Sequence, residues 1–366
     1  MRILHIAPFN IAGVPIEFVR AERTLGHYSR LVTLGRDRRG YEEDICLELP
    51  MIDDPILRLV KHVASSKRVL RKSNLREHPD QIPRVWKPRG MLECLLVRLR
   101  DRIWESRIMP SIRKYGLLDF DIYQLDGGLG FLRSGKIIKE LKSRGKKVVC
   151  CYLGSDLRLR GVIPQIDSIS DLNLTTEFDL RELHPDIHHI FFPFNPYRFQ
   201  VMERRNKVLR ICHSPTDRKA KGSERIIATV RELAKRYPVR LVLIENLPYD
   251  VAIKLKAGCD IMIDQLGELG YGISSLEALA MGIPTLTALT PEYEACIPDH
   301  PFIKVDEETL KERLIELIED GQMRHRKGLE GRRWVERYHD SRTVVSGILA
   351  KYREFGWIDE YGNFIC

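Results

Sequence analysis

The sequence has no long apolar run. No segment approaches the roughly 18 uncharged apolar residues that a membrane-spanning helix needs. The first residues, 1–6, are too few for a secretory signal and are typical of a first strand. Internal repeats of about 20–50 residues and low-complexity tracts are also missing, which argues against solenoids and arrays. What remains is a globular composition, 43% hydrophobic and 30% charged, in 366 residues that suffice for two domains.

The sequence also lacks a set of residues well placed to bind a metal. The eight cysteines are scattered and none forms a Cys-x-x-Cys pair, which argues against a zinc ribbon or a disulfide framework and favours the reducing cytoplasm. Asp119 and Asp121 have an Asp-x-Asp spacing but precede an expected strand, at the wrong end for a ligand site. His188 and His189 are adjacent in an expected strand and would point to opposite faces. We therefore expect no bound metal and no cofactor.

Positive charge is concentrated in one stretch. Residues 55–115 contain 16 Lys and Arg against five acids, a net +11, whereas the whole chain carries +9. Amphipathic helix patterns at 57–70 and 92–103 are separated by prolines, so we interpret the stretch as an inserted helical arm. Its charge suits an anionic membrane surface, a phosphate group or an acidic substrate, while helices with solvated charged faces are the alternative. Nucleic acid is disfavoured because aromatic residues are sparse there.

Short apolar strands alternate with helical patterns around this arm. This order predicts parallel sheets with right-handed crossovers and two doubly wound α/β domains. In the second half, the pattern predicts strands at 208–212, 240–245, 260–264, 285–288 and 302–305.

A glycine-rich loop follows the expected strand at 260–264. Gly270 and Gly272 would let the backbone approach a ligand closely. The amides from Gly272 through Ile273 and Ser274 to Ser275 lie at a helix start, where the helix dipole favours an anion such as a diphosphate. Glu277 allows two interpretations, because it either completes a Ser-x-x-Glu capping box with Ser274 or accepts hydroxyl groups of a nucleotide sugar.

A basic loop follows the first expected strand of the second half. Arg218 and Lys221 lie in this loop, just before Gly222 and Ser223 open a helix. Loops at the carboxyl edge of a parallel sheet are the usual ligand crevice, so the two cations are candidates for binding phosphate oxygens. A solvated basic turn is the alternative.

These segments together resemble the second half of glycosyltransferase family 4. The matching motifs are Lys221-Gly222, Gly270-Tyr271-Gly272, Glu277-Ala278-Leu279-Ala280 and Gly282-Ile283-Pro284. The loop at Gly13, the stretch 154–158 and the closing helices extend the resemblance over nearly the whole chain. It implies the GT-B fold, with two Rossmann-like domains facing a cleft and the basic arm inserted in the first. Residues 1–200 would bind the acceptor, 205–338 the donor, and 339–366 would cross back toward the first domain.

The resemblance implies a hexosyltransferase that uses a UDP- or GDP-linked sugar, with retention and without metal. Arg218 and Lys221 would stabilise the leaving diphosphate, and Glu277 would hold the ribose. The first Glu of the family signature falls at Leu269, with Glu268 one place away, which leaves the donor sugar open. An epimerase or hydrolase on the same fold and a non-catalytic nucleotide-sugar-binding protein are the alternatives.

The acceptor is expected on the first domain. Gly13, Gly127 and Gly128 would line its site, and Asp126 would position or deprotonate the acceptor hydroxyl, with a turn aspartate as the alternative. Asp156 and Arg158 are further candidates, with a surface pair as the alternative. The basic arm favours a lipid-linked or anionic acceptor and peripheral membrane contact.

Overall fold

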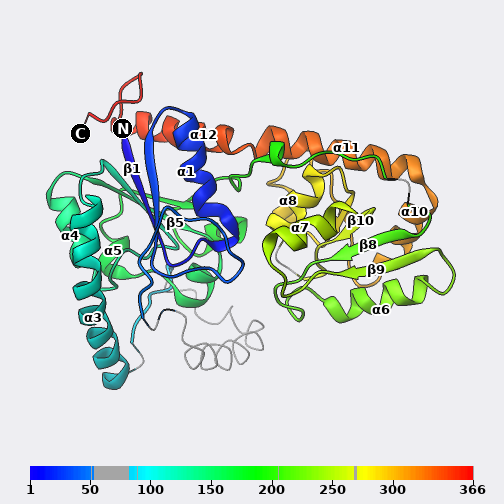
Figure 1. Cartoon of the computed structure of the whole chain (residues 1–366), viewed down its shortest axis with the longest axis horizontal. Helices are drawn as coiled ribbons and strands as arrows, with labels where there is room; N and C mark the ends of the chain where they lie inside the picture. Colours follow the sequence, from blue (N-terminus) through cyan, green and yellow to red (C-terminus); the bar gives the residue numbers. More distant parts are fainter. Residues whose placement is uncertain (51, 53–81, 89, 205, 268–269, 366) are drawn as a thin grey trace. The chain divides into compact units, whose positions relative to one another are not determined.

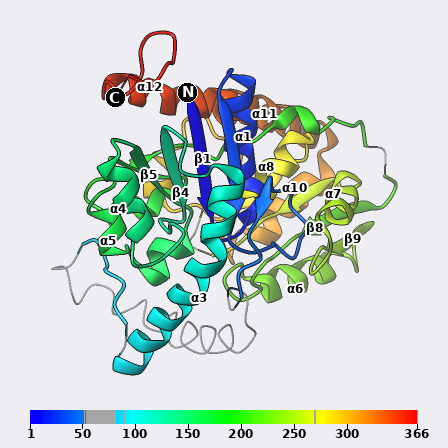
Figure 2. The same ribbon diagram turned by 60° about the vertical axis from the view of Figure 1, so that its left-hand side comes forward.

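The computed structural model describes residues 1–50, 52, 82–88, 90–204, 206–267 and 270–365. The chain divides into two compact units, which we call unit 1 (residues 1–37, 41–191 and 345–366) and unit 2 (residues 38–40 and 192–344). Each unit is a parallel sheet with helices packed on it (Figures 1 and 2), which confirms the predicted pair of doubly wound α/β units. Within the described ranges, no helix is both long enough and apolar enough to cross a bilayer.

Unit 1 contains a seven-stranded parallel sheet in the order β3-β2-β1-β4-β5-β6-β7. Its strands are β1 (Arg2–Ala7), β2 (Tyr28–Thr33), β3 (Ile45–Cys46), β4 (Ile122–Asp126), β5 (Lys147–Tyr152), β6 (Leu172–Thr175) and β7 (His188–His189). The chain runs from β1 toward β3 on one side and from β4 toward β7 on the other. The strand order therefore reverses between β1 and β4.

Helices cover both faces of this sheet. They are α1 (Val14–Thr24), α3 (Met91–Tyr115), α4 (Lys136–Ser143), α5 (Pro164–Asp167) and the second part of α12 (Ser341–Glu354). Leu4 and Ile6 of β1 pack in the large core with α3 and α4, whereas Ala7 packs in a smaller cluster with α1. This alternation follows from the two-residue period of a strand. The part of the arm predicted as a helix at 57–70 lies outside the described residues.

Unit 2 contains a five-stranded parallel sheet in the order β12-β11-β10-β8-β9. Its strands are β8 (Leu209–His213), β9 (Val239–Leu243), β10 (Ile261–Ile263), β11 (Thr285–Thr287) and β12 (Ile303–Lys304). Each strand begins within one residue of its predicted start. Its helices are α6 (Ser223–Leu233), α7 (Tyr249–Ala257), α8 (Ile273–Ala280), α9 (Pro291–Glu294), α10 (Leu310–Glu319) and α11 (Gly321–Tyr338).

Helices α8 and α11 of unit 2 approach each other through glycine. A Cβ added at Gly328 of α11 would lie 2.1 Å from the carbonyl oxygen of Gly282, which follows α8. A Cβ at Gly331, one turn later, would lie 2.6 Å from the side chain of Leu279. Arg332 donates to the carbonyl of Ala280 at 2.7 Å and ties the same two elements together. This contact fixes the end of α8, whose beginning lies in the candidate site described below.

We expect Gly328→Ala to destabilise the protein by about 1–3 kcal/mol, because the new methyl group would displace backbone atoms that cannot move alone. Gly347→Ala in α12 is the matched control, since a Cβ there meets nothing within 4 Å. The control should stabilise the protein by about 0.5–1 kcal/mol, the helix preference for alanine over glycine. Thermal unfolding of both variants checks this, and equal melting temperatures would contradict it.

Candidate functional site

The strand order of unit 2 reverses between β8 and β10. The chain leaves β8 toward β9 on one side and continues through β10, β11 and β12 on the other. Ligands of parallel α/β sheets bind outside the carboxyl ends of the strands at such a reversal, because the loops there leave in opposite directions. His213 ends β8, and Asp264 directly follows β10. The loops after these two strands therefore form the candidate site.

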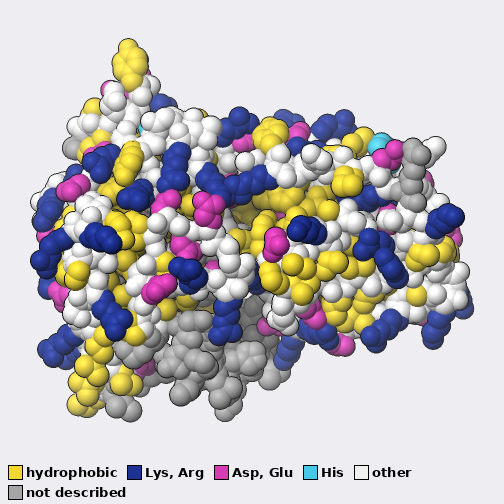
Figure 3. Space-filling model, viewed as in Figure 1, with side chains coloured by type: hydrophobic (Ala, Val, Ile, Leu, Met, Phe, Trp, Pro, Cys, Tyr) yellow, Lys and Arg dark blue, Asp and Glu magenta, His cyan; other side chains and the backbone are white. Residues whose placement is uncertain are grey.

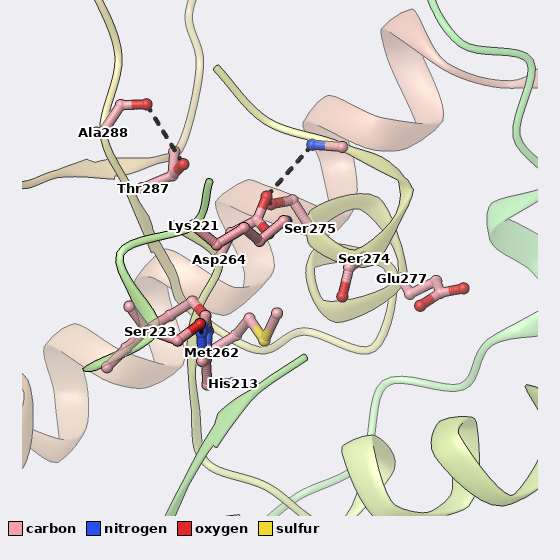
Figure 4. A network of polar contacts seen from close by, with 12 residues as sticks. His213, Lys221, Ser223, Met262, Asp264, Ser274, Ser275, Glu277, Thr287 and Ala288 are labelled. Carbon is pink, nitrogen blue, oxygen red and sulfur yellow. Dashed lines mark hydrogen bonds and ion pairs between the residues drawn. The ribbon is translucent and has the colours of Figure 1, made fainter. Parts of the chain in front are cut away.

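A buried carboxylate joins the basic loop to the glycine-rich loop. Asp264 has no exposed surface, and one of its oxygens accepts a hydrogen bond from the Lys221 ammonium group. Its other oxygen accepts hydrogen bonds from the Ser275 hydroxyl at 2.6 Å and from the Gly272 amide at 3.3 Å. Figure 4 shows Lys221, Asp264 and Ser275 together beside α8. Three of the residues predicted for donor binding are thus brought together by an aspartate that was not predicted as a site residue.

The charges of Lys221 and Asp264 balance each other, but the cluster still has hydrogen-bond donors that can bind an anion. Burial alone would raise the pKa of Asp264, but the Lys221 ammonium group and the hydrogen bonds from Ser275 and Gly272 outweigh it and lower that pKa. The Lys221 side chain is 18% exposed, so its ammonium group has donors to spare for a ligand. The amides of Ile273 and Ser274 open α8 and have no acceptor within the described part of the chain. Such amides favour negative charge.

The two glycines of the glycine-rich loop have different roles. Gly270 has a φ of +62°, and a Cβ there would lie 2.4 Å from the ring of Tyr293. The group that lies close to the backbone at Gly270 is therefore a side chain of the protein, Tyr293, and not a ligand. Gly272 has a φ of −132°, and a Cβ there would meet no atom of the described residues within 4 Å. Among these residues, the open space for a ligand therefore lies at Gly272 and not at Gly270.

A neutral histidine fixes the start of α6. The His213 ring is fully buried, and burial lowers its pKa. Its Nδ1 donates to the Ile263 carbonyl at 2.8 Å, because a carbonyl only accepts, and its Nε2 therefore accepts from the Ser223 hydroxyl at 2.7 Å. His213 thereby ties β8 to β10 and holds the first residue of α6. Pattern analysis of the sequence did not assign it a role.

Glu277 binds a buried lysine that was also not predicted. Lys256 of α7 is 2% exposed, and its ammonium group donates to the Glu277 carboxylate and, at 2.8 Å, to the Ser274 hydroxyl. Helix α8 begins after Gly272 with no side-chain cap, so the capping-box interpretation of Ser274 and Glu277 is wrong. The reason is that the helix begins at Ile273, so Ser274 lies inside the helix and not at its N-cap, and its hydroxyl binds Lys256 instead. Figure 4 shows Ser274 and Glu277 on α8.

Arg218 does not share contacts with the Lys221 cluster. Its guanidinium group binds both oxygens of Glu245, at 2.8 and 2.7 Å, and Glu224 at 3.1 Å. The two cations predicted to act together therefore bind different carboxylates. Glu268 and Leu269, the positions where the family signature departs, lie outside the described residues.

Asp126 of unit 1 is a buried ion-pair partner. It ends β4 and has no exposed surface. Its carboxylate binds Nδ1 of His5 at 3.1 Å and the Gln124 amide at 2.8 Å, and the other ring nitrogen of His5 binds Glu22 of α1 at 3.0 Å. In this arrangement the carboxylate is not presented to an acceptor hydroxyl. The expected role of Asp126 in positioning or deprotonating the acceptor therefore finds no geometric support, because the side chain points into the interior.

The glycines predicted for the acceptor side lie at the strand-order reversal of unit 1. Gly127 and Gly128 follow β4 with φ values of +84° and +60°, and a Cβ at Gly128 would lie 2.4 Å from the Tyr152 ring. Gly13 opens α1 with a φ of +73°. All three occupy the left-handed region that favours glycine. The loops after β1 and β4 thus form the corresponding crevice position of the first sheet.

Asp156 and Arg158 have separate partners. Asp156 accepts hydrogen bonds from the amides of residues 153, 154 and 157 at 2.7–2.9 Å. Arg158 binds Glu177 at 2.7 Å and Asp179 at 2.5 Å. The alternative of a surface pair is wrong, because neither residue binds the other. Both side chains hold the loop after β5 in place.

No protein-family model and no curated protein sequence matches the chain. Solved structures share its fold. Sucrose-phosphate synthase from Thermosynechococcus elongatus is 13% identical with a TM-score of 0.62, over 97% of this chain and 99% of that chain. Anabaena HepE, solved with UDP and glucose, is 10% identical with a TM-score of 0.57, over 96% and 99%. A putative UDP-N-acetylglucosamine 2-epimerase from Listeria monocytogenes is 12% identical with a TM-score of 0.57, over 100% and 99%.

These neighbours confirm the predicted GT-B class of fold. At a sequence identity of 10–13%, the similarity to these structures establishes the fold but not the activity. Membership of glycosyltransferase family 4 stays a prediction from the motifs.

The His5 cluster makes the stability of unit 1 depend on pH. Burial disfavours the charged imidazole, but Glu22 and Asp126 outweigh it and raise the pKa of His5 to about 10. In the unfolded chain that pKa is about 6.5, so the stabilisation is complete below pH 6.5 and is lost as the pH rises to 10. We expect the free energy of unfolding to fall across this window in urea titrations. His5→Gln should remove this slope and cost about 3–5 kcal/mol at pH 6.5, because it leaves buried carboxylates unpaired.

His325→Gln is the matched control, because His325 is exposed on α11. This variant should keep the wild-type slope and stability. An unchanged slope in His5→Gln would contradict the assignment of the charged form to His5.

Proposed function

We propose that this protein is a nucleotide-sugar-dependent glycosyltransferase that moves a hexose from a UDP- or GDP-linked donor to an acceptor hydroxyl with retention. The observation that carries the proposal is the cluster of Lys221, Asp264 and Gly272 at the strand-order reversal of unit 2. Among the solved structures with this fold, a glycosyltransferase from Rickettsia africae and Anabaena HepE, which was solved with UDP and glucose, support it.

The proposed chemistry is stabilisation of a leaving diphosphate. When the bond between the anomeric carbon and the phosphate oxygen breaks, negative charge grows on the diphosphate. Lys221 and the amides of Ile273 and Ser274 are already oriented by Asp264 and α8, so they would meet this charge without reorganisation. Fixed cations and amides would thus do what a divalent metal does in other transferases.

The proposed ribose contact is the Glu277 carboxylate. One of its oxygens is bound by Lys256, which leaves the other to accept hydroxyl groups. The lysine also balances the charge of Glu277, which would otherwise repel a diphosphate bound nearby. We therefore assign Lys256 a positioning role.

The acceptor is proposed to bind at the loops after β1 and β4, near Gly13, Gly127 and Gly128. Because Asp126 is buried, the group that receives the acceptor proton is sought elsewhere, with the leaving diphosphate itself as the proposed base.

An epimerase is the second candidate, because UDP-N-acetylglucosamine 2-epimerases are among the structures with this fold. Incubation with a nucleotide sugar and no acceptor separates the two. An epimerised or free sugar would favour the alternative, and an intact donor would argue against it.

Lys221→Ala is expected to weaken UDP or GDP binding about 10–100-fold, since a charge-assisted hydrogen bond contributes roughly 1.5–3 kcal/mol. Glu277→Ala should weaken binding about tenfold by the loss of the ribose contact. Isothermal titration calorimetry with UDP, GDP and ADP measures both changes.

Lys219→Ala is the matched control, because Lys219 lies in the same loop and is exposed. It should bind nucleotides as the wild type does. Arg218→Ala shows whether Arg218 leaves Glu245 to bind the diphosphate. Equal affinities of wild type, Lys221→Ala and Glu277→Ala for every nucleotide would overturn the proposed site.

Lys256→Met is expected to destabilise the protein by about 3–5 kcal/mol, because it leaves a buried carboxylate without its partner. The double variant Lys256→Met, Glu277→Gln should recover part of this loss, which urea unfolding measures. Lys256→Arg should retain binding better than Lys256→Met. A positioning role further requires that Lys256→Met reduce the preference for UDP over 2′-deoxy-UDP, and an unchanged preference would show a purely structural role.

A further inference from the structure

Helix α3 has apolar side chains on two opposite faces. Trp104, Ile108 and Ile112 follow one another every four residues and are buried in the core of unit 1. Leu95 and Leu99 have the same spacing but are 63% and 53% exposed. Five residues separate Leu99 from Trp104, a rotation of about 140° on a helix with 3.6 residues per turn. The first turns of α3 therefore direct an apolar face away from the core that holds its later turns.

This exposed face is extended by two neighbouring side chains. Met91 and Leu96 are 92% and 55% exposed. Figure 1 shows the beginning of α3 projecting from the sheet of unit 1, and Figure 3 shows hydrophobic side chains gathered at that end of the helix. A contiguous apolar patch at a protruding helix end is typical of an interaction surface.

Cations flank the apolar face. Arg98 and Arg102 are exposed and have no ion-pair partner among the residues that the structure describes. Of the acids on the same helix, Asp101 binds Arg100 at 2.6 Å, Glu105 binds Lys136, and Glu93 in the first turn also has a partner. The surrounding stretch, 55–115, carries a net +11. The patch thus combines apolar side chains with unbalanced positive charge.

We infer that the first turns of α3 dock on an anionic lipid surface. Leu95, Leu96 and Leu99 would enter the boundary between headgroups and acyl chains, and Arg98 and Arg102 would bind lipid phosphates. An anionic lipid surface fits this patch better than an apolar groove of another protein does. The lipid phosphates would be counterions for Arg98 and Arg102, whereas an uncharged groove would offer these arginines none. This inference concerns unit 1 and stands independently of the nucleotide site in unit 2.

The test is co-sedimentation of the full chain with vesicles. We expect binding to phosphatidylcholine vesicles that contain about 30% phosphatidylglycerol, weak binding to pure phosphatidylcholine, and a strong decrease near 1 M salt, where the Debye length falls to about 3 Å. Leu95→Ser with Leu99→Ser, and Arg98→Glu with Arg102→Glu, should each lower the partition coefficient by about tenfold or more. Leu95→Trp should show a blue-shifted emission on binding.

Two variants in unit 2 are matched controls. Val251→Ser with Leu329→Ser removes two exposed apolar side chains, and Arg326→Glu with Arg333→Glu makes the same charge change on α11. Both should bind vesicles as the wild type does, and all variants should retain nucleotide affinity.

Three outcomes would overturn the inference. The first is equal binding to neutral and anionic vesicles, or none to either. The second is a loss confined to the arginine variant, because it would show that the leucines do not enter the lipid. The third is a melting temperature of the Leu95→Ser, Leu99→Ser variant that falls by much more than the lower helix propensity of serine explains, because it would show that another part of the chain covers this face.

Discussion

The ion pair between Lys221 and Asp264 is the interaction on which the candidate site depends. Asp264 follows β10, Lys221 belongs to the loop after β8, and the same carboxylate also holds Gly272 and Ser275 at the start of α8. One buried anion thus sets the positions of a cation from the loop after β8 and of an amide and a hydroxyl from the start of α8. Because the pair is neutral, an incoming diphosphate would meet the remaining donors of Lys221 and the amides of α8 rather than an uncompensated negative charge.

A second buried ion pair, between Lys256 and Glu277, also holds helix α8 in place. Lys256 holds Glu277 and Ser274, and the glycine contact between α8 and α11 fixes the end of the helix. Helix α8 is therefore held at its start by Asp264, along its first turns by Lys256, and at its end by α11. A rigid helix start suits a site that must present its amides at a constant distance from a ligand.

Sequence patterns predicted the sheets of unit 2 well, because short apolar runs bounded by Gly and Pro are local signals. They predicted the loops after β8 and β10 as the site for the same reason. The partners of the charged residues were not predictable, since Asp264 lies 43 residues from Lys221 and Asp126 lies 121 residues from His5. The Ser-x-x-Glu spacing predicted a capping box at Ser274, which was wrong because α8 already begins at Ile273. The actual partner of Ser274 and Glu277, Lys256, comes from another helix. The full length of α3 was also missed, because the helix continues through Pro110, a residue that usually ends one.

The division of the chain into units has a consequence for synthesis. Unit 2 is nearly continuous, from 192 to 344, whereas unit 1 includes the segment 345–366. During translation, the ribosome releases every residue of unit 2 before the last piece of unit 1 leaves the exit tunnel. Unit 2 can therefore complete its fold before unit 1 has received its last segment, which then adds to a core already built from earlier residues.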